Sequence, residues 1–228
     1  RDGETVCKGL LVLDDARARP LPTVMISHMW SGREEFVEAK ARELAQQGYA
    51  AFALDMYGDG RRGRTPDESK ALMQPFVDDR ALLARRIRIA LDAVRALPDV
   101  DGSRIAALGF CFGGMCVLDL ARSGADVRAV ISMHGLLKSH ALPKQPIRAK
   151  VLALHGYDDP LAPAEDVRAF QQEMAAARAD WQIHVYGGTG HAFTNPKAAS
   201  PEAGLVYNAT AARRAWATLL DFLSEALH

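Results

Sequence analysis

Hydrophobic residues along the chain gather in short runs, and the stretches between these runs alternate apolar and charged positions with helical spacing. Short apolar runs predict buried strands, and the amphipathic stretches predict helices. We expect strands at residues 5–13, 23–27, 50–55, 104–109, 127–133, 151–155 and 181–186. We expect helices at residues 34–47, 78–96, 113–122, 164–177 and 210–226. This alternation predicts an α/β fold with a mostly parallel central sheet flanked by helices on both faces.

One segment, residues 55–75, fits neither pattern. It reads DMYGDGRRGRTPDESKALMQP, is rich in Gly, Arg and Pro, and follows a predicted strand. Ligands bind at the carboxyl ends of strands in open α/β sheets, so we expect this segment to be a loop beside a site. Its arginines, Arg61, Arg62 and Arg64, either face that site or keep a solvated loop soluble. The pattern leaves open whether the segment acts as a lid.

Length, charge and cysteine usage narrow the class of protein. The 228 residues predict a single domain over 1–228, and 28 basic residues balance 28 acidic ones. Because the chain carries no net charge, we expect its partner to be a small-molecule substrate rather than nucleic acid or a membrane. We expect the protein to be a monomer or a homodimer. No apolar run approaches the about 20 residues of a membrane span. Three cysteines without metal-ligand spacing favour a reducing, cytoplasmic location, although a leader removed before Arg1 remains an alternative.

The sequence GFCFGG, residues 109–114, places Cys111 between small residues, after a predicted strand and before a predicted helix. This is the setting of a nucleophile elbow, in which a sharp turn exposes a reactive side chain. The start of the helix directs unpaired N–H groups at the sulfur and stabilises the thiolate. We therefore interpret Cys111 as a nucleophile. We interpret Cys116 and Cys7 as packed cysteines.

A cysteine nucleophile needs a base and a group that orients the base. After Cys111, a predicted strand ends in a loop with Asp158 and Asp159, and the next strand ends in a Gly-rich loop with His191. Both loops lie at the same sheet edge as the elbow. The spacing predicts a triad in the order nucleophile, acid, histidine. His134 also follows a strand, and it is an alternative lining residue of the pocket.

The motifs GFCFGG, HGYDDPLAP, GTGHAF and LDMYGDG resemble, in order and spacing, those of the dienelactone hydrolase family of α/β-hydrolases, over nearly the whole chain. The resemblance implies a Cys111, Asp159 and His191 triad. Asp159 is preferred because the acid of the family lies three residues after a glycine and four before a proline. The resemblance also implies oxyanion donors at the backbone N–H groups of Phe112 and Trp30.

Two positions depart from the family. Well-studied members carry a glutamate at the place of Met29, where it helps to form the thiolate. They also carry an arginine that holds the substrate carboxylate at the place of Asn195. A methionine and an amide cannot replace these groups, so the resemblance implies a substrate other than dienelactone itself.

From these residues we expect a hydrolase that cleaves carboxylic esters or lactones through a thioester on Cys111, with no metal and no cofactor. An apolar and aromatic pocket would favour neutral aryl or hydrophobic esters, and a thiolate beside an oxyanion hole could also attack phosphotriesters. The alternative is a non-hydrolytic redox-sensing or ligand-binding protein that uses the elbow cysteine. The candidate pocket residues, each of which could equally belong to the core, are Met29, Trp30, Tyr57, Phe76, Phe112, Phe193 and Asn195.

Overall fold

A seven-stranded sheet forms the centre of the computed structural model, which describes residues 1–143 and 145–228. Its strand order is β1-β3-β2-β4-β5-β6-β7, and all neighbouring strands are parallel except β1 and β3. The mostly parallel α/β sheet is therefore confirmed. The strands are β1 Leu10–Val12, β2 Leu21–Ser27, β3 Ala50–Ala53, β4 Val100–Phe110, β5 Ala129–Met133, β6 Lys150–Gly156 and β7 Trp181–Tyr186.

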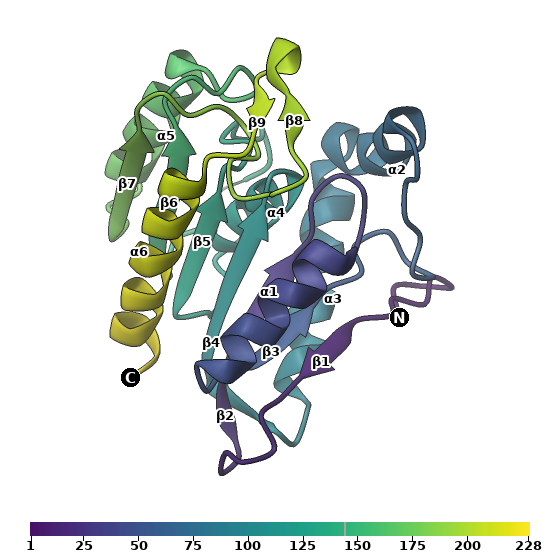
Figure 1. Ribbon diagram of the computed structural model, residues 1–228. Coiled ribbons are helices and arrows are strands. Elements are labelled where there is room, and N and C mark those ends of the chain that lie inside the picture. The colour runs from purple at the N-terminus through teal and green to yellow at the C-terminus, as the bar shows by residue number, and fades with distance from the viewer. Residues whose placement is uncertain (144) are drawn as a thin grey trace.

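Helices cover both faces of the sheet, with α1 and α6 in front of it and α3 and α4 behind it in the view of Figure 1. None of the helices within the described ranges is long and apolar enough to cross a membrane. The helices are α1 Glu35–Gln46, α2 Pro66–Asp78, α3 Arg80–Arg95, α4 Phe112–Arg122, α5 Ala164–Ala176 and α6 Ala209–Leu227.

The central strands and α4 form the core. Every residue of β2 and β5 is buried, and so is every residue of α4. Parallel strands covered on both faces read as continuous apolar runs, which explains why the pattern located them well. The burial of α4 holds its first turn rigidly against the sheet.

The prediction of a loop over residues 55–75 is wrong in its second half, because α2 begins within it. The Thr65 hydroxyl accepts a hydrogen bond from the Glu68 backbone N–H at 3.2 Å and caps the start of α2. Asp79 caps α3 in the same way, accepting from the Leu82 N–H at 2.9 Å. The capped helix α2 therefore precedes the predicted helix of residues 78–96, which appears as α3, and the Arg- and Gly-rich composition concealed the first cap.

The first predicted strand is also shorter than expected. Only residues 10–12 form β1, which is the edge strand and pairs antiparallel with β3. The preceding residues are held by a loop instead, where the Lys8 N–H donates to Asp55 at 2.8 Å and the Val6 carbonyl accepts from Asp59. A further pair of two-residue strands, β8 Ala199–Ser200 and β9 Leu205–Val206, was not predicted because so short a pattern carries no period.

Candidate active site

Cys111 lies in the sharp turn between β4 and α4. Its backbone has φ 54° and ψ −117°, a positive φ that residues with a side chain rarely adopt. Its N–H donates to the Met133 carbonyl at 3.1 Å, which ties the turn to β5. The side chain is 8% exposed. This strained turn at a strand-to-helix junction is the geometry of a nucleophile elbow.

The glycines around Cys111 allow three elements to meet closely. A Cβ on Gly109 would lie 1.9 Å from the Gly113 carbonyl oxygen, and a Cβ on Gly113 would lie 2.2 Å from the Ser27 oxygen. Any side chain at either position would force β4, α4 and β2 apart. The first turn of α4 is thus pressed against the end of β2, and the loop that follows β2 lies beside it.

His191 and Asp159 come together on the other side of Cys111. The Nδ1 atom of His191 lies 2.8 Å from Asp159 Oδ2, and both side chains are buried. The second oxygen of Asp159 accepts from the N–H groups of Leu161 and Ala162, at 2.8 and 3.3 Å. Asp158 is exposed. Of the two candidate acids, the structure therefore brings Asp159 to the histidine.

Close packing between loops places the His191 main chain. A Cβ on Gly156 would lie 2.4 Å from the Thr189 carbonyl oxygen, so the absence of a side chain lets the loops after β6 and β7 touch. The His191 N–H donates to the Gly204 carbonyl at 2.8 Å, and its carbonyl accepts from Val206 at 3.3 Å. The β8–β9 hairpin thus holds the histidine backbone from a second side.

The remaining ring nitrogen of His191, Nε2, is buried and has no hydrogen-bond partner within residues 1–143 and 145–228. Burial by itself disfavours the charged imidazolium. The negative charge of the Cys111 sulfur and the hydrogen bond to Asp159 outweigh that effect and raise the pKa of His191 to about 10. A thiolate and an imidazolium are therefore mutually stabilising in this arrangement.

His28, which the sequence reasoning missed, fixes the loop after β2. Its Nδ1 lies 2.6 Å from the Met29 carbonyl oxygen, and its Nε2 accepts a hydrogen bond from the Met56 N–H at 3.2 Å. Burial lowers the pKa of His28 to about 4, so the ring is neutral and Nδ1 carries the donated proton. A histidine directly after a mostly apolar strand was the available signal.

Tyr57 makes a second bond to the same loop, donating its hydroxyl to the Trp30 carbonyl at 2.7 Å. The Met29 carbonyl and the Trp30 N–H belong to one planar peptide and point in opposite directions. Because His28 holds the Met29 carbonyl, it also sets the direction of the Trp30 N–H. No described residue accepts a hydrogen bond from the Trp30 N–H, which leaves it free for a ligand.

The candidate pocket residues fall into two groups. Tyr57, Phe76 and Phe112 pack against one another, with ring centroids 5.7 to 6.1 Å apart, and all three are buried. Phe193, in the His191 loop, instead packs against Tyr186, with ring centroids 5.5 Å apart. Met29 is also buried. These residues are packed core side chains as well as neighbours of the elbow.

The polar residues of the predicted pocket are engaged in local structure. The side-chain oxygen of Asn195 accepts from the Lys197 N–H at 3.0 Å and closes a turn. Arg61 donates to main-chain carbonyls of its own loop, and Arg62 pairs with Glu38 at 3.1 Å. Asn195, Arg61 and Arg62 therefore each use their polar groups in local contacts.

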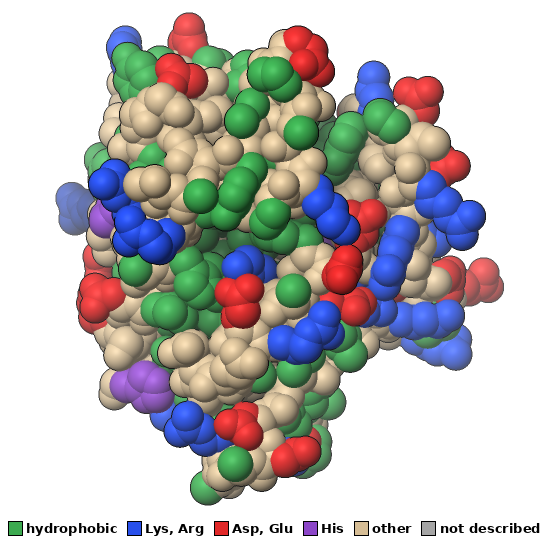
Figure 2. Space-filling model, in the orientation of Figure 1, with side chains coloured by type: hydrophobic (Ala, Val, Ile, Leu, Met, Phe, Trp, Pro, Cys, Tyr) green, Lys and Arg blue, Asp and Glu red, His purple; other side chains and the backbone are tan. Residues whose placement is uncertain are grey.

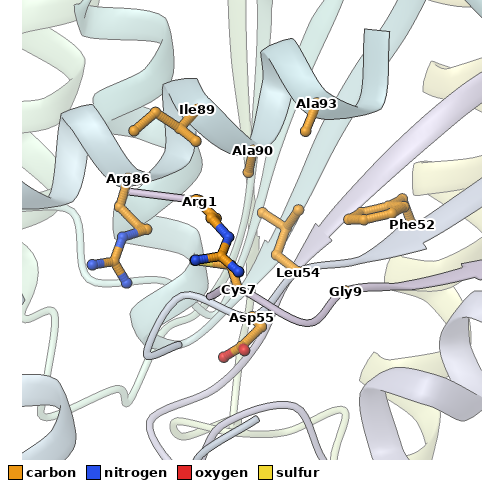
Figure 3. A pocket seen from close by; sticks show the side chains of 10 residues that line it. All are labelled: Arg1, Cys7, Gly9, Phe52, Leu54, Asp55, Arg86, Ile89, Ala90 and Ala93. Atoms are coloured by element: carbon orange, nitrogen blue, oxygen red, sulfur yellow. The ribbon is translucent and has the colours of Figure 1, made fainter. Parts of the chain in front are cut away.

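The other two cysteines lie in different surroundings. Cys116 is fully buried one turn further along α4, and burial raises its pKa far above the usual value. Cys7 is half-buried and lines a cavity of about 70 Å³ beside Leu54, Asp55 and Arg86 (Figure 3). Burial raises the pKa of this thiol too.

A larger groove of about 320 Å³ lies between α1 and α6, and Figure 2 shows the hollow on this face. None of Cys111, Asp159 and His191 lines it. No group of three or more potential metal ligands was found among the described side chains. The groove is lined by Phe36, Ala39, Lys40, Glu43, Thr194, Pro196, Tyr207, Ala209, Ala212, Arg213 and Trp216.

The sheet order, the elbow and the loops at the carboxyl edge define an α/β-hydrolase fold. The model of the dienelactone hydrolase family matches residues 8–227, and the chain belongs to that family of hydrolases. A Yersinia pestis protein named "Putative carboxymethylenebutenolidase" is 31% identical over 92% of this chain and 80% of its own length.

Two solved structures agree with this assignment. A dienelactone hydrolase-like promiscuous phosphotriesterase from metagenomic libraries is 38% identical, with a TM-score of 0.93 over 100% of this chain and 96% of its own. A protein titled putative dienelactone hydrolase, from Klebsiella pneumoniae, is 26% identical, with a TM-score of 0.77 over 95% of this chain and 92% of its own. The predicted family and fold are confirmed.

Proposed function

We propose that this hydrolase cleaves neutral carboxylic esters or lactones through a thioester on Cys111. The observation that carries the proposal is the 2.8 Å hydrogen bond between Asp159 and His191, which leaves Nε2 of the histidine unpaired and under the influence of the Cys111 sulfur. This bond supports a triad in which Asp159 orients His191 and His191 acts as the base for Cys111.

In the proposed cycle, His191 Nε2 takes the thiol proton and the Cys111 sulfur attacks the carbonyl carbon. The oxyanion that forms accepts hydrogen bonds from the N–H groups of Phe112 and Trp30. Collapse of the tetrahedral intermediate breaks the carbon–oxygen bond, and the imidazolium returns its proton to the leaving alkoxide. His191 then deprotonates a water, which attacks the thioester, releases the acid and restores the thiol.

The surroundings favour neutral and apolar substrates. Phe112, the residue after Cys111, packs with Tyr57 and Phe76 into a buried aromatic group, and burying an unpaired carboxylate against such a group is costly. Asn195 is used in its own turn, and its amide lacks the charged, bidentate donor of an arginine. We therefore expect aryl or hydrophobic esters to react faster than substrates that carry a carboxylate beside the scissile bond.

Neutral phosphotriesters are a second candidate substrate class. The support is the 38% identical relative described as a promiscuous phosphotriesterase. A thiolate beside an oxyanion hole attacks phosphorus through a comparably charged intermediate. We expect this activity to be slow beside ester hydrolysis, because transfer of a phosphoryl group to sulfur also has to be reversed by water.

The test compares p-nitrophenyl esters of graded chain length with matched esters that carry a carboxylate next to the acyl carbon. We expect higher kcat/KM for the neutral series. Cys111→Ala should abolish turnover, and mass spectrometry of quenched wild-type reactions should detect the acyl group on the peptide that contains Cys111.

Cys116→Ala is the matched control, because it removes a buried thiol from the same helix and should retain activity. Turnover by Cys111→Ala at the wild-type rate would overturn the assignment of the nucleophile. A chain that hydrolyses no ester, yet forms a sulfenic acid at Cys111 with dilute peroxide, would instead support the redox-sensing alternative.

A further inference from the structure

His134 is a buried histidine that the proposed cycle does not use. It follows β5, and its backbone has φ 39°, a value that costs a non-glycine residue energy. Its N–H donates to the Leu154 carbonyl at 2.8 Å, which anchors it to the neighbouring strand β6. The side chain is fully buried. The position is therefore rigid, and strained backbone of this kind is concentrated at functional sites.

The ring of His134 contacts the loop that carries His191 at three places. Its centroid lies 5.4 Å from that of His191, edge to face, and 5.3 Å from that of Phe193. Its Nε2 lies 2.7 Å from the Thr194 hydroxyl oxygen. One side chain at the end of β5 thus contacts the loop at His191 and again three residues later.

The hydrogen-bond pattern indicates which nitrogen of His134 carries the proton. Nδ1 is buried and has no partner in the described part of the chain. A buried bare nitrogen costs less than a buried unpaired N–H, so Nε2 carries the proton and donates it to Thr194. The ring is then locked against rotation by one directional bond.

His134 does not compete for protons with His191. Burial lowers the pKa of His134 well below its usual value, and the nearby charges of His191 and His155 lower it further. These two histidines are the titratable groups that act on it. His134 therefore stays uncharged while His191 carries a proton, and it offers a fixed, neutral surface to the charged ring.

We propose that His134 and Thr194 form a clamp that positions His191, holding its ring so that Nε2 points at Cys111. The inference rests on the proposed role of His191 as the base. The clamp is needed because the backbone of the loop is strained: Ala192, the residue after His191, has φ 56°. The bond to Asp159 holds Nδ1 of His191, and the His134 ring limits the remaining tilt of the imidazole about that bond.

The test removes the directional bond and keeps the volume, with Thr194→Val. Thr194→Ser restores the hydroxyl. Thr23→Val is the matched control, because Thr23 is a buried threonine that donates to the Leu21 carbonyl at 3.0 Å. It lies near the amino end of β2, whereas the candidate site lies at the carboxyl ends of the strands. We expect Thr194→Val to lower kcat for a neutral p-nitrophenyl ester on the order of tenfold with KM unchanged, the rate equivalent of one hydrogen bond. Thr194→Ser and Thr23→Val should stay near the wild-type kcat.

A second measurement follows the rate of Cys111 alkylation by iodoacetamide against pH, which needs no ester turnover. In wild type, the imidazolium of His191 keeps the sulfur reactive at acidic and neutral pH, and His191→Ala should abolish this reactivity. Thr194→Val should move the profile part of the way towards that of His191→Ala, whereas a merely structural role would lower stability and leave the profile in place.

Two outcomes separate the hypotheses. If Thr194→Val retains both the wild-type kcat and the wild-type alkylation profile, the clamp is overturned. If His191→Ala has the same alkylation profile as wild type, the proposed thiolate–imidazolium pair is wrong, and this result is distinct from failure of the clamp. Equal losses of kcat in Thr194→Val and Thr23→Val would likewise contradict the clamp.

Discussion

On one side of Cys111 lie two ionisable side chains, Asp159 and His191, joined by a buried hydrogen bond. On the other side lie main-chain N–H groups, and the residues that orient them, His28 and Tyr57, are held in their uncharged forms by burial. In the proposed cycle the first side moves protons, and the second presents fixed dipoles to the oxyanion. We therefore expect substitutions on the acid–base side to alter protonation and pH dependence, and substitutions on the oxyanion side to alter rate alone.

The largest effect should follow Asp159→Asn. The amide oxygen would keep the N–H donors of Leu161 and Ala162, so the NH₂ group would face His191 Nδ1. The histidine would then carry its proton on Nε2 and could not accept one from the thiol. We expect kcat to fall about ten-thousand-fold, as the wrong tautomer does in serine hydrolases. Steady-state hydrolysis of a p-nitrophenyl ester measures the loss.

Asp158→Asn is the control for this substitution, since Asp158 is the exposed neighbour. It should react at a rate close to wild type. An Asp159→Asn enzyme within a few-fold of wild type would show that the hydrogen bond to His191 does not set the tautomer.

The dependence of the wild-type reaction rate on pH should reveal the raised pKa of His191. Because the pKa of His191 is raised to about 10, the imidazolium that protonates the leaving group persists above the usual range of histidine. As the pH rises through that value, the proton is lost, and kcat/KM should fall about tenfold per further unit. A fall that is already complete near pH 7 would show that Cys111 and Asp159 do not act on the ring as described.

On the oxyanion side, His28→Phe should have a smaller effect. It keeps a ring between Tyr57 and Phe112 but removes both bonds, to the Met29 carbonyl and from the Met56 N–H. The Trp30 N–H would lose its fixed direction, and we expect kcat to fall about a hundredfold, as when one oxyanion donor is lost. The shape of the pH profile should overlay that of wild type, and a shifted profile would refute the division between the two sides.

Tyr57→Phe should have the smallest effect. It removes only the hydroxyl that donates to the Trp30 carbonyl, while the ring stays packed against Phe76 and Phe112. One hydrogen bond contributes about 1 kcal/mol, so we expect a few-fold fall in kcat and a similar small loss in the free energy of unfolding by urea. A fall as large as that of His28→Phe would show that the hydroxyl has a direct catalytic role.

The elements that the sequence located best are those whose position depends on hydrophobic burial. The α-helix that it missed, α2, depends on a local hydrogen bond at its start. The strands β2, β4, β5 and β6 appear close to the predicted positions because both faces of a central strand are buried. The strand β7 also appears where it was predicted, although it is an edge strand with no fully buried residue. The helix α2 was missed because its core contribution is small, only Ser69 and Phe76 being buried. Its start depends on a cap at Thr65 rather than on a periodic apolar face.

The sequence alone determined the family, the sheet and the candidates Cys111, Asp159 and His191, because each of these follows a strand within a short, specific pattern of small residues. Only the tertiary structure decided the contacts of His28, Tyr57 and His134. Their partners lie 27 to 60 residues away in the chain, at Met56, Trp30 and Thr194, so no local pattern announces them. Burial then decides their charge, since a histidine removed from water carries a second proton and a positive charge only beside an anion.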